Sequence, residues 1–214
     1  MPLPYLFISF VLFLVWLNWR ANRAARRDES VREAFWAREH KANSTRKQSL
    51  SGLDYITIPP DLLPSDCGTL SDNAHDAAMR IDRLREDNEP IVNLTGYTNT
   101  DLKLTYGAAN LNELSVYDAH YTLLATSLQD CGGALYDSGR FEESAKVLEF
   151  AVQTGTDVTR TYKLLLDMYE NKLSLDEATK EKKLDILLES ANNLRSLSKD
   201  GIVSMVEEKQ GVII

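Results

Sequence analysis

The chain has 214 residues, a formal net charge of −8 from 24 Lys and Arg against 32 Asp and Glu, and 43% hydrophobic residues. This length holds one or two small domains, and the composition excludes both a disordered chain and a polytopic membrane protein. Two cysteines and three scattered histidines offer neither a disulfide framework nor metal-ligand spacing. We therefore expect no metal and no cofactor.

The charge is distributed unevenly along the chain. Residues 1–19 carry no charged side chain, residues 20–50 hold nine Lys and Arg against four Asp and Glu, and residues 51–214 hold 15 against 28. The chain is thus an uncharged segment, a basic segment of +5 and an acidic body of −13. Because the basic residues are interleaved with acids and the body would repel phosphate, we expect no nucleic-acid binding.

Residues 1–19 are predicted to form a transmembrane anchor. Between Pro2 and Trp19 only Ser9 and Asn18 are polar, and a helix of this length spans about 27 Å, close to the thickness of a hydrocarbon core. The alternative, a cleavable signal peptide, would carry its positive residues before the apolar run, whereas here they follow it. These residues are Arg20, Arg23, Arg26 and Arg27.

The arginine cluster also predicts the topology. The positive-inside rule places it in the cytoplasm, so we expect a single-pass protein with its N-terminus outside and its C-terminal domain cytoplasmic. A bacterial plasma membrane is the expected location, and the mitochondrial outer membrane is the alternative.

Two segments connect the predicted anchor to the acidic body. Residues 20–48 contain no Pro or Gly and predict a basic juxtamembrane helix, whose Lys and Arg either attract anionic headgroups or only fix the topology. Residues 49–99 predict a linker, or a strap packed on the domain, because Pro59, Pro60 and Pro64 interrupt regular structure. Within it, apolar residues at helical spacing predict a short helix over 73–88.

Residues 100–210 predict a helical domain. Thr98 and Asp101 form an N-terminal capping pair, and long helical patterns run over 113–137 and from Phe141 to about residue 155. Thr156 and Asp157 are predicted to cap the next helix, and a capping box at 174–177 opens another. The short turns between these helices indicate antiparallel pairs.

Residues 128–151 resemble the tetratricopeptide repeat, a helix-turn-helix unit of 34 residues. The residues that carry the resemblance are the close-packing Gly132, the turn glycine Gly139, the following aromatic Phe141, and the small residues Ser144 and Ala151. One period later the phase holds through Tyr162 and Leu166, after which the second unit is distorted. A plain helical bundle would share the apolar periodicity and is the alternative. The predicted fold is therefore all-α, an N-terminal transmembrane helix followed by a tetratricopeptide-like domain.

The family resemblance implies that a protein or peptide binds the concave face formed by the first helix of each pair. The corresponding positions are Gln129, Gly133, Tyr136, Lys163, Asp167 and Glu170. The acidic body would favour a basic or neutral partner, mainly through steering. The alternative is that these residues only solvate an exposed face. The chain also resembles an uncharacterised group of bacterial membrane-anchored proteins with such a domain, which implies no particular activity. We predict an adaptor or scaffold role at the cytoplasmic face of the membrane.

An enzyme of unrecognised type is the second hypothesis. The sequence contains no phosphate-binding glycine loop, no Gly-x-Ser-x-Gly and no His-Glu-x-x-His. His75 and Asp76 are adjacent on a predicted helix, where sequence neighbours do not face each other. We therefore expect no catalytic residue and no small-molecule substrate.

Overall fold

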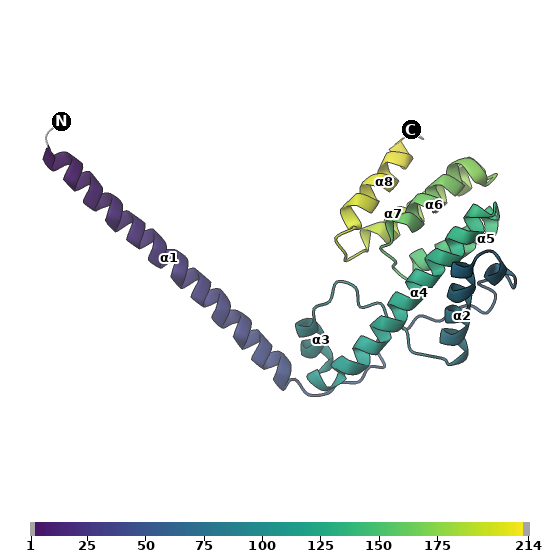
Figure 1. The fold of residues 1–214 in the computed structure, drawn as a ribbon, viewed down its shortest axis with the longest axis horizontal. Coiled ribbons are helices and arrows are strands. Elements are labelled where there is room, and N and C mark those ends of the chain that lie inside the picture. Colours follow the sequence, from purple (N-terminus) through teal and green to yellow (C-terminus); the bar gives the residue numbers. More distant parts are fainter. Residues whose placement is uncertain (1–2, 212–214) are drawn as a thin grey trace. The chain divides into compact units, whose positions relative to one another are not determined.

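The computed structural model describes residues 3–211, apart from the side chains of residues 3–6, 21–22 and 24–28. The described chain is all-helical, as predicted, with one isolated β-bridge between Tyr55 and Val92 (Figure 1). Its α-helices are α1 (Leu3–Ser44), α2 (Asp72–Glu86), α3 (Asn99–Tyr106), α4 (Leu111–Asp137), α5 (Phe141–Gln153), α6 (Thr159–Asp167), α7 (Glu177–Asn192) and α8 (Lys199–Gly211). Shorter turns are η1 (Cys67–Thr69), η2 (Ala108–Asn110) and the π-helical η3 (Met168–Lys172).

Contacts divide the chain into two compact units. The N-terminal unit comprises Met1–Ser49 and Thr98–Leu111, and the helical body comprises Leu50–Tyr97 and Asn112–Ile214. Residues 50–97 thus belong to the body, the following segment with α3 belongs to the N-terminal unit, and the chain belongs to the body again from Asn112. This division differs from the predicted boundaries at residues 49 and 100, because α3 packs with α1 and the segment before it packs with the body.

The N-terminal unit joins α3 to the C-terminal end of α1. Arg38 donates to Asp101 at 2.6 Å, and Lys103 Nζ donates to Asn43 Oδ1 at 2.9 Å. The predicted capping pair is confirmed, since Thr98 and Asp101 form a reciprocal capping box at the start of α3.

The predicted anchor lies in the first half of α1. In the part of the chain that the structure describes, no helix has a stretch both long and apolar enough to cross a membrane. Residues 1–6 of the predicted anchor lie wholly or in their side chains outside the described part. The anchor therefore remains a prediction.

The core of the helical body lies on two sides of α5. One cluster joins α2 and α4 to Val147 and Ala151 of α5, and includes residues from Leu50–Leu70, a segment we call the strap. The other cluster joins the opposite face of α5, including Leu148, to α6, α7 and α8. Figure 1 accordingly shows α2 on one side of the α4–α5 hairpin and α6–α8 on the other. The segment 49–99 is predicted to be a linker or a packed strap, and the burial of Ile58 and Leu62 shows that its part over Leu50–Leu70 packs on the body.

The α4–α5 hairpin is closely packed at Gly132. A Cβ atom on Gly132 would lie 2.6 Å from Leu148 Cγ, and Ser144 Oγ donates to the Gly132 carbonyl at 2.7 Å. Gly139 has φ +79° in the connecting turn, and Ala151 is buried near the end of α5. The residues that carry the repeat resemblance therefore lie at the turn and the contact surface of one helix pair.

Two predicted helix starts are wrong by a few residues. The residue that caps α6 is Val158, because Thr156 is buried and its carbonyl accepts a hydrogen bond from Tyr162 Oη at 3.0 Å. The residue that caps α7 is Asp176, whose carboxylate accepts the Thr179 N–H at 3.1 Å. The predicted capping residue, Ser174, lies instead in the loop that follows η3, two residues before the N-cap.

Candidate functional site

Four of the six predicted binding residues lie where α4 meets α6. Gln129 Oε1 accepts a hydrogen bond from Thr161 Oγ1 at 2.6 Å, and Gly133 is buried beside it. Tyr136 Oη donates to Asp167 Oδ2. The Tyr136 hydroxyl, with a second hydrogen bond from Asn171, holds the pKa of Asp167 below its usual range. These polar groups join two helices to each other.

The other two predicted residues differ in their surroundings. Glu170 accepts a hydrogen bond from Lys209 Nζ of α8 at 2.8 Å, whereas the side chain of Lys163 is exposed on α6. Five of the six predicted residues are therefore buried or bonded within the chain. A partner on this face would have to replace those bonds.

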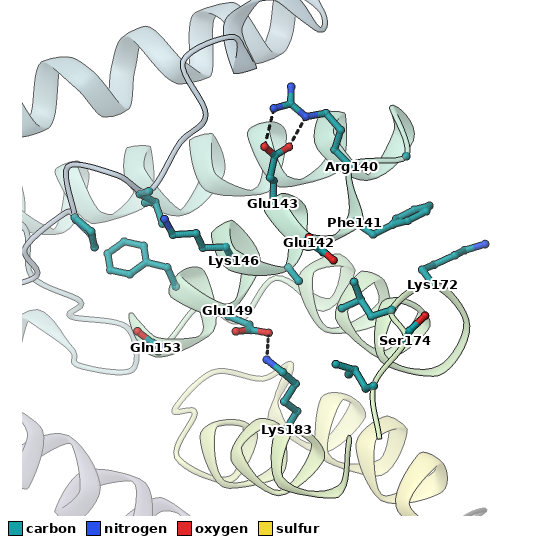
Figure 2. Close-up of a pocket in the computed structure, with 17 residues that line it drawn as sticks. Arg140, Phe141, Glu142, Glu143, Lys146, Glu149, Gln153, Lys172, Ser174 and Lys183 are labelled. Carbon is teal, nitrogen blue, oxygen red and sulfur yellow. Dashed lines mark hydrogen bonds and ion pairs between the residues drawn. The ribbon is translucent and has the colours of Figure 1, made fainter. Parts of the chain in front are cut away.

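A concavity of the body lies on the outer side of α5. A groove of about 830 Å³ has Phe141, Ala145 and Phe150 of α5 on its floor. The strap forms one wall through Pro59 and Leu62, and the segment from Lys172 to Leu175, together with Lys183 of α7, forms the other. Figure 2 shows the α5 side chains pointing into this space and Lys183 reaching across it. We call this feature the α5 groove.

A smaller hollow of about 230 Å³ extends the α5 groove toward the end of the helix. It shares Phe150 and Gln153 with the main groove and is otherwise lined by strap residues 54–57 with Asn93 and Thr154. Asn93 Nδ2 donates to the carbonyls of Thr154 and Gly155 at 3.0 and 3.1 Å, which satisfies two acceptors at the end of α5. The concavity therefore follows the full length of α5.

Ion pairs hold the strap wall against α5. Lys146 Nζ donates to Asp61 Oδ2 at 2.7 Å, and Arg140 Nη1 donates to Asp66 Oδ1 at 2.9 Å. Arg140 also donates to Glu143, as Figure 2 shows. The hydrogen bond from Lys146 lowers the pKa of Asp61, and that from Arg140 lowers the pKa of Glu143. The two basic residues are thus neutralised by carboxylates of the strap and of α5 itself.

The opposite wall is joined to α5 through Glu149. Its Oε1 accepts hydrogen bonds from Lys183 Nζ at 2.6 Å and from Tyr169 Oη at 2.9 Å. At the end of the groove near Gly139, Lys172 Nζ lies 5.7 Å from the centre of the Phe141 ring and makes a cation–π contact with it (Figure 2). This end combines an aromatic ring, the partly buried Leu173 and Leu175, and an ammonium group.

The chemistry of the α5 groove suits binding. Its lining contains no His and no Cys, and its carboxylates are held by Lys or Arg except for the exposed Glu142 and Asp54. Across the described residues, no group of three or more His, Cys, Asp and Glu is arranged to hold a metal ion. Apolar floor atoms with charged rims are the composition of a surface that takes a peptide or a protein segment.

No local sequence pattern predicts the α5 groove. Lys146 of α5 and Asp61 of the strap, which join the floor of the groove to one wall, are 85 positions apart. The charges on α5 have the pattern of a solvated helix face, and the prolines of the strap indicate only a break in regular structure. The pairing of these two segments depends on tertiary packing.

Comparisons with protein-family models, with curated protein sequences and with solved structures give no match. The tetratricopeptide resemblance therefore rests on the residues of the α4–α5 hairpin. What the chain does must be argued from its own surfaces.

Proposed function

We propose that this protein is a membrane-anchored adaptor whose helical body binds a protein or peptide partner in the α5 groove. The observation that carries the proposal is the groove itself, which has an apolar floor and rims of paired charges. Its volume of about 830 Å³ is in the range of specific ligand sites. Helix α5 has 13 residues and is about 20 Å long, which matches about six residues of an extended peptide.

The character of the partner follows from the charges. Residues 51–214 carry 15 Lys and Arg against 28 Asp and Glu, so long-range steering favours a basic or neutral partner. Inside the α5 groove most charges already have partners, so affinity would come from apolar contacts on Phe141 and Phe150. The repeat-like packing of α4 and α5 around Gly132 supports a scaffold of the helical-repeat kind.

Blocking the α5 groove is expected to abolish binding. Gln153 is exposed where the two hollows meet, so Gln153→Trp should fill the passage without disturbing the core. We would select displayed random peptides on the detergent-solubilised full chain and expect the selected peptides to bind this variant at least about tenfold more weakly, a loss of about 1.4 kcal/mol.

A matched control separates the two candidate faces. Lys163→Glu alters the exposed residue of the α4–α6 face and should leave the selected peptides bound. If Lys163→Glu abolishes binding and Gln153→Trp does not, the binding face is the one implied by the family resemblance. If neither variant has an effect, or no peptide is selected, the adaptor proposal loses its support.

The membrane anchor is part of the same proposal and has its own test. Residues 1–19 contain no charge and Arg20 to Arg27 follow them, so we expect the protein to stay in the membrane pellet after alkaline carbonate extraction. Cys67 and Cys131 are buried, so a label for topology is better placed at the fully exposed Leu197 as Leu197→Cys. Labelling of that thiol by an impermeant maleimide in intact cells would contradict a cytoplasmic body.

A further inference from the structure

Two buried thiols of the helical body lie close to each other. Cys67 begins η1 in the strap and is 1% exposed, and Cys131 lies in α4 and is 0% exposed. Both belong to the hydrophobic cluster between the strap, α2 and α4, where each thiol lies close enough to alter the ionisation of the other. The Cys131 thiol donates to the Ala74 carbonyl of α2 at 3.9 Å. A single buried cysteine commonly acts as a small apolar residue. Two thiols from distant parts of the chain, held close together, have a further chemistry.

The two sulfur atoms are not equivalent. The Cys131 thiol lowers the pKa of Cys67, and the nearby Arg140 guanidinium adds to this against the effect of burial. The Cys67 thiol and burial raise the pKa of Cys131. Arg140 is held in place by Asp66, the residue before Cys67, at 2.9 Å. Cys67 is therefore the thiol that ionises first, and Cys131 stays protonated, with its thiol donating to the Ala74 carbonyl.

We propose that Cys67 and Cys131 form a reversible disulfide that links the strap to α4. Both thiols lie in one buried cluster, which brings the strap and α4 together. The proposal does not depend on peptide binding, although the strap that it would fix is also a wall of the α5 groove.

The oxidant is a low-molecular-weight disulfide, and the reaction balances as thiol–disulfide exchange. The Cys67 thiolate attacks one sulfur of the oxidant and expels the first thiolate, which leaves a mixed disulfide on Cys67. Cys131 loses its proton and attacks the Cys67 sulfur, which expels the second thiolate. The protein loses two protons and two electrons, and the oxidant leaves as two thiols.

The strap provides the access that this exchange requires. Cys67 lies in a three-residue turn, and Asp66 and Thr69 on either side of it are exposed. Opening of this turn would expose Cys67 without unfolding α4, and short irregular segments open at a lower free energy than packed helices.

The test treats the detergent-solubilised full chain with oxidised glutathione and identifies linked peptides by mass spectrometry. We expect a Cys67–Cys131 cross-link, a mass lower by two hydrogen atoms, and reversal by dithiothreitol. Because the bond closes a loop of about 65 residues, the thermal midpoint should rise by on the order of 10 °C over the reduced protein. Oxidation should also slow the hydrogen exchange of the backbone amides in the strap.

Cys67→Ser and Cys131→Ser are the controls and should show neither the mass loss nor the rise in midpoint. If a serine variant does not fold, the cross-link map of the wild-type chain still decides the question. A stable glutathione adduct, a disulfide between chains, or unchanged thiols under conditions that oxidise a small dithiol would each overturn the proposal.

Discussion

Replacing Gly132 with alanine is expected to destabilise the helical body by about 2–3 kcal/mol, whereas the same replacement at Gly133 is expected to leave it unchanged or to stabilise it by up to about 1 kcal/mol. The two glycines are adjacent in α4, so helix propensity affects both equally. The difference between the two changes in stability therefore reports how closely α5 approaches α4 at Gly132.

The structure explains why the two positions differ. The added Cβ at position 132 would lie 2.6 Å from Leu148 Cγ, and Leu148 is fully buried, so it cannot move aside without displacing the second core cluster. At position 133 the nearest atom is Arg160 Nη2 at 3.5 Å, an ordinary contact with a side chain that is 61% exposed.

Urea denaturation of the full chain in detergent provides the measurement. A double-mutant cycle with Leu148→Ala isolates the contact. Because the smaller side chain relieves the clash, the double variant should lose less stability than the sum of the losses in the two single variants. Equal stabilities for the Gly132 and Gly133 variants would show that the helices are not in contact at this point.

The hairpin was predictable from the sequence because its signals are local. A small residue at Gly132, a turn glycine at Gly139 and an aromatic at Phe141 each satisfy a requirement of the adjacent backbone. The positive φ of Gly139 and the start of α5 at Phe141 agree with that reasoning.

The candidate site was not predictable, for two physical reasons. The α5 groove requires the strap to meet α5 through Asp61 and Lys146, and no local pattern encodes that meeting. On the other face, Tyr136 and Asp167 have the polarity of solvated residues, yet they bond to each other across two helices. Sequence polarity does not distinguish a group bonded to water from one bonded to a neighbouring helix.

The assignment of α3 to the N-terminal unit was not predictable from the sequence, for the same reason. Arg38 and Asp101 have the composition of surface residues, but their pairing assigns α3 to the end of α1. The connection depends on the return of the chain after α3, where Gly107 has φ +90° and packs against the backbone of residues 46 and 47.

Gly107→Ala is therefore expected to cost more than about 3 kcal/mol within the N-terminal unit, whereas Gly139→Ala should cost only about 1–2 kcal/mol. Both glycines have positive φ, and at Gly139 no atom lies within 4 Å of the added Cβ. At Gly107 the Cβ would lie 2.7 Å from the Arg46 carbonyl carbon and 2.8 Å from Lys47 Cα. Backbone atoms cannot rotate away as a side chain can.

The loss of stability caused by Gly107→Ala should be confined to the N-terminal unit. The clash should separate α3 from the segment that follows α1. Two hydrogen bonds between these segments would then break, one from Gln48 N to the Tyr106 carbonyl at 2.9 Å and one from Asn110 Nδ2 to the Gln48 carbonyl at 2.7 Å. Hydrogen exchange should accelerate over residues 45–48 and 99–110 and stay unchanged in α5, while Gly139→Ala should affect the α4–α5 turn instead. Unchanged protection at 99–110 in the Gly107 variant would mean that α3 does not depend on this contact, and the division of the chain into these two units would have to be redrawn.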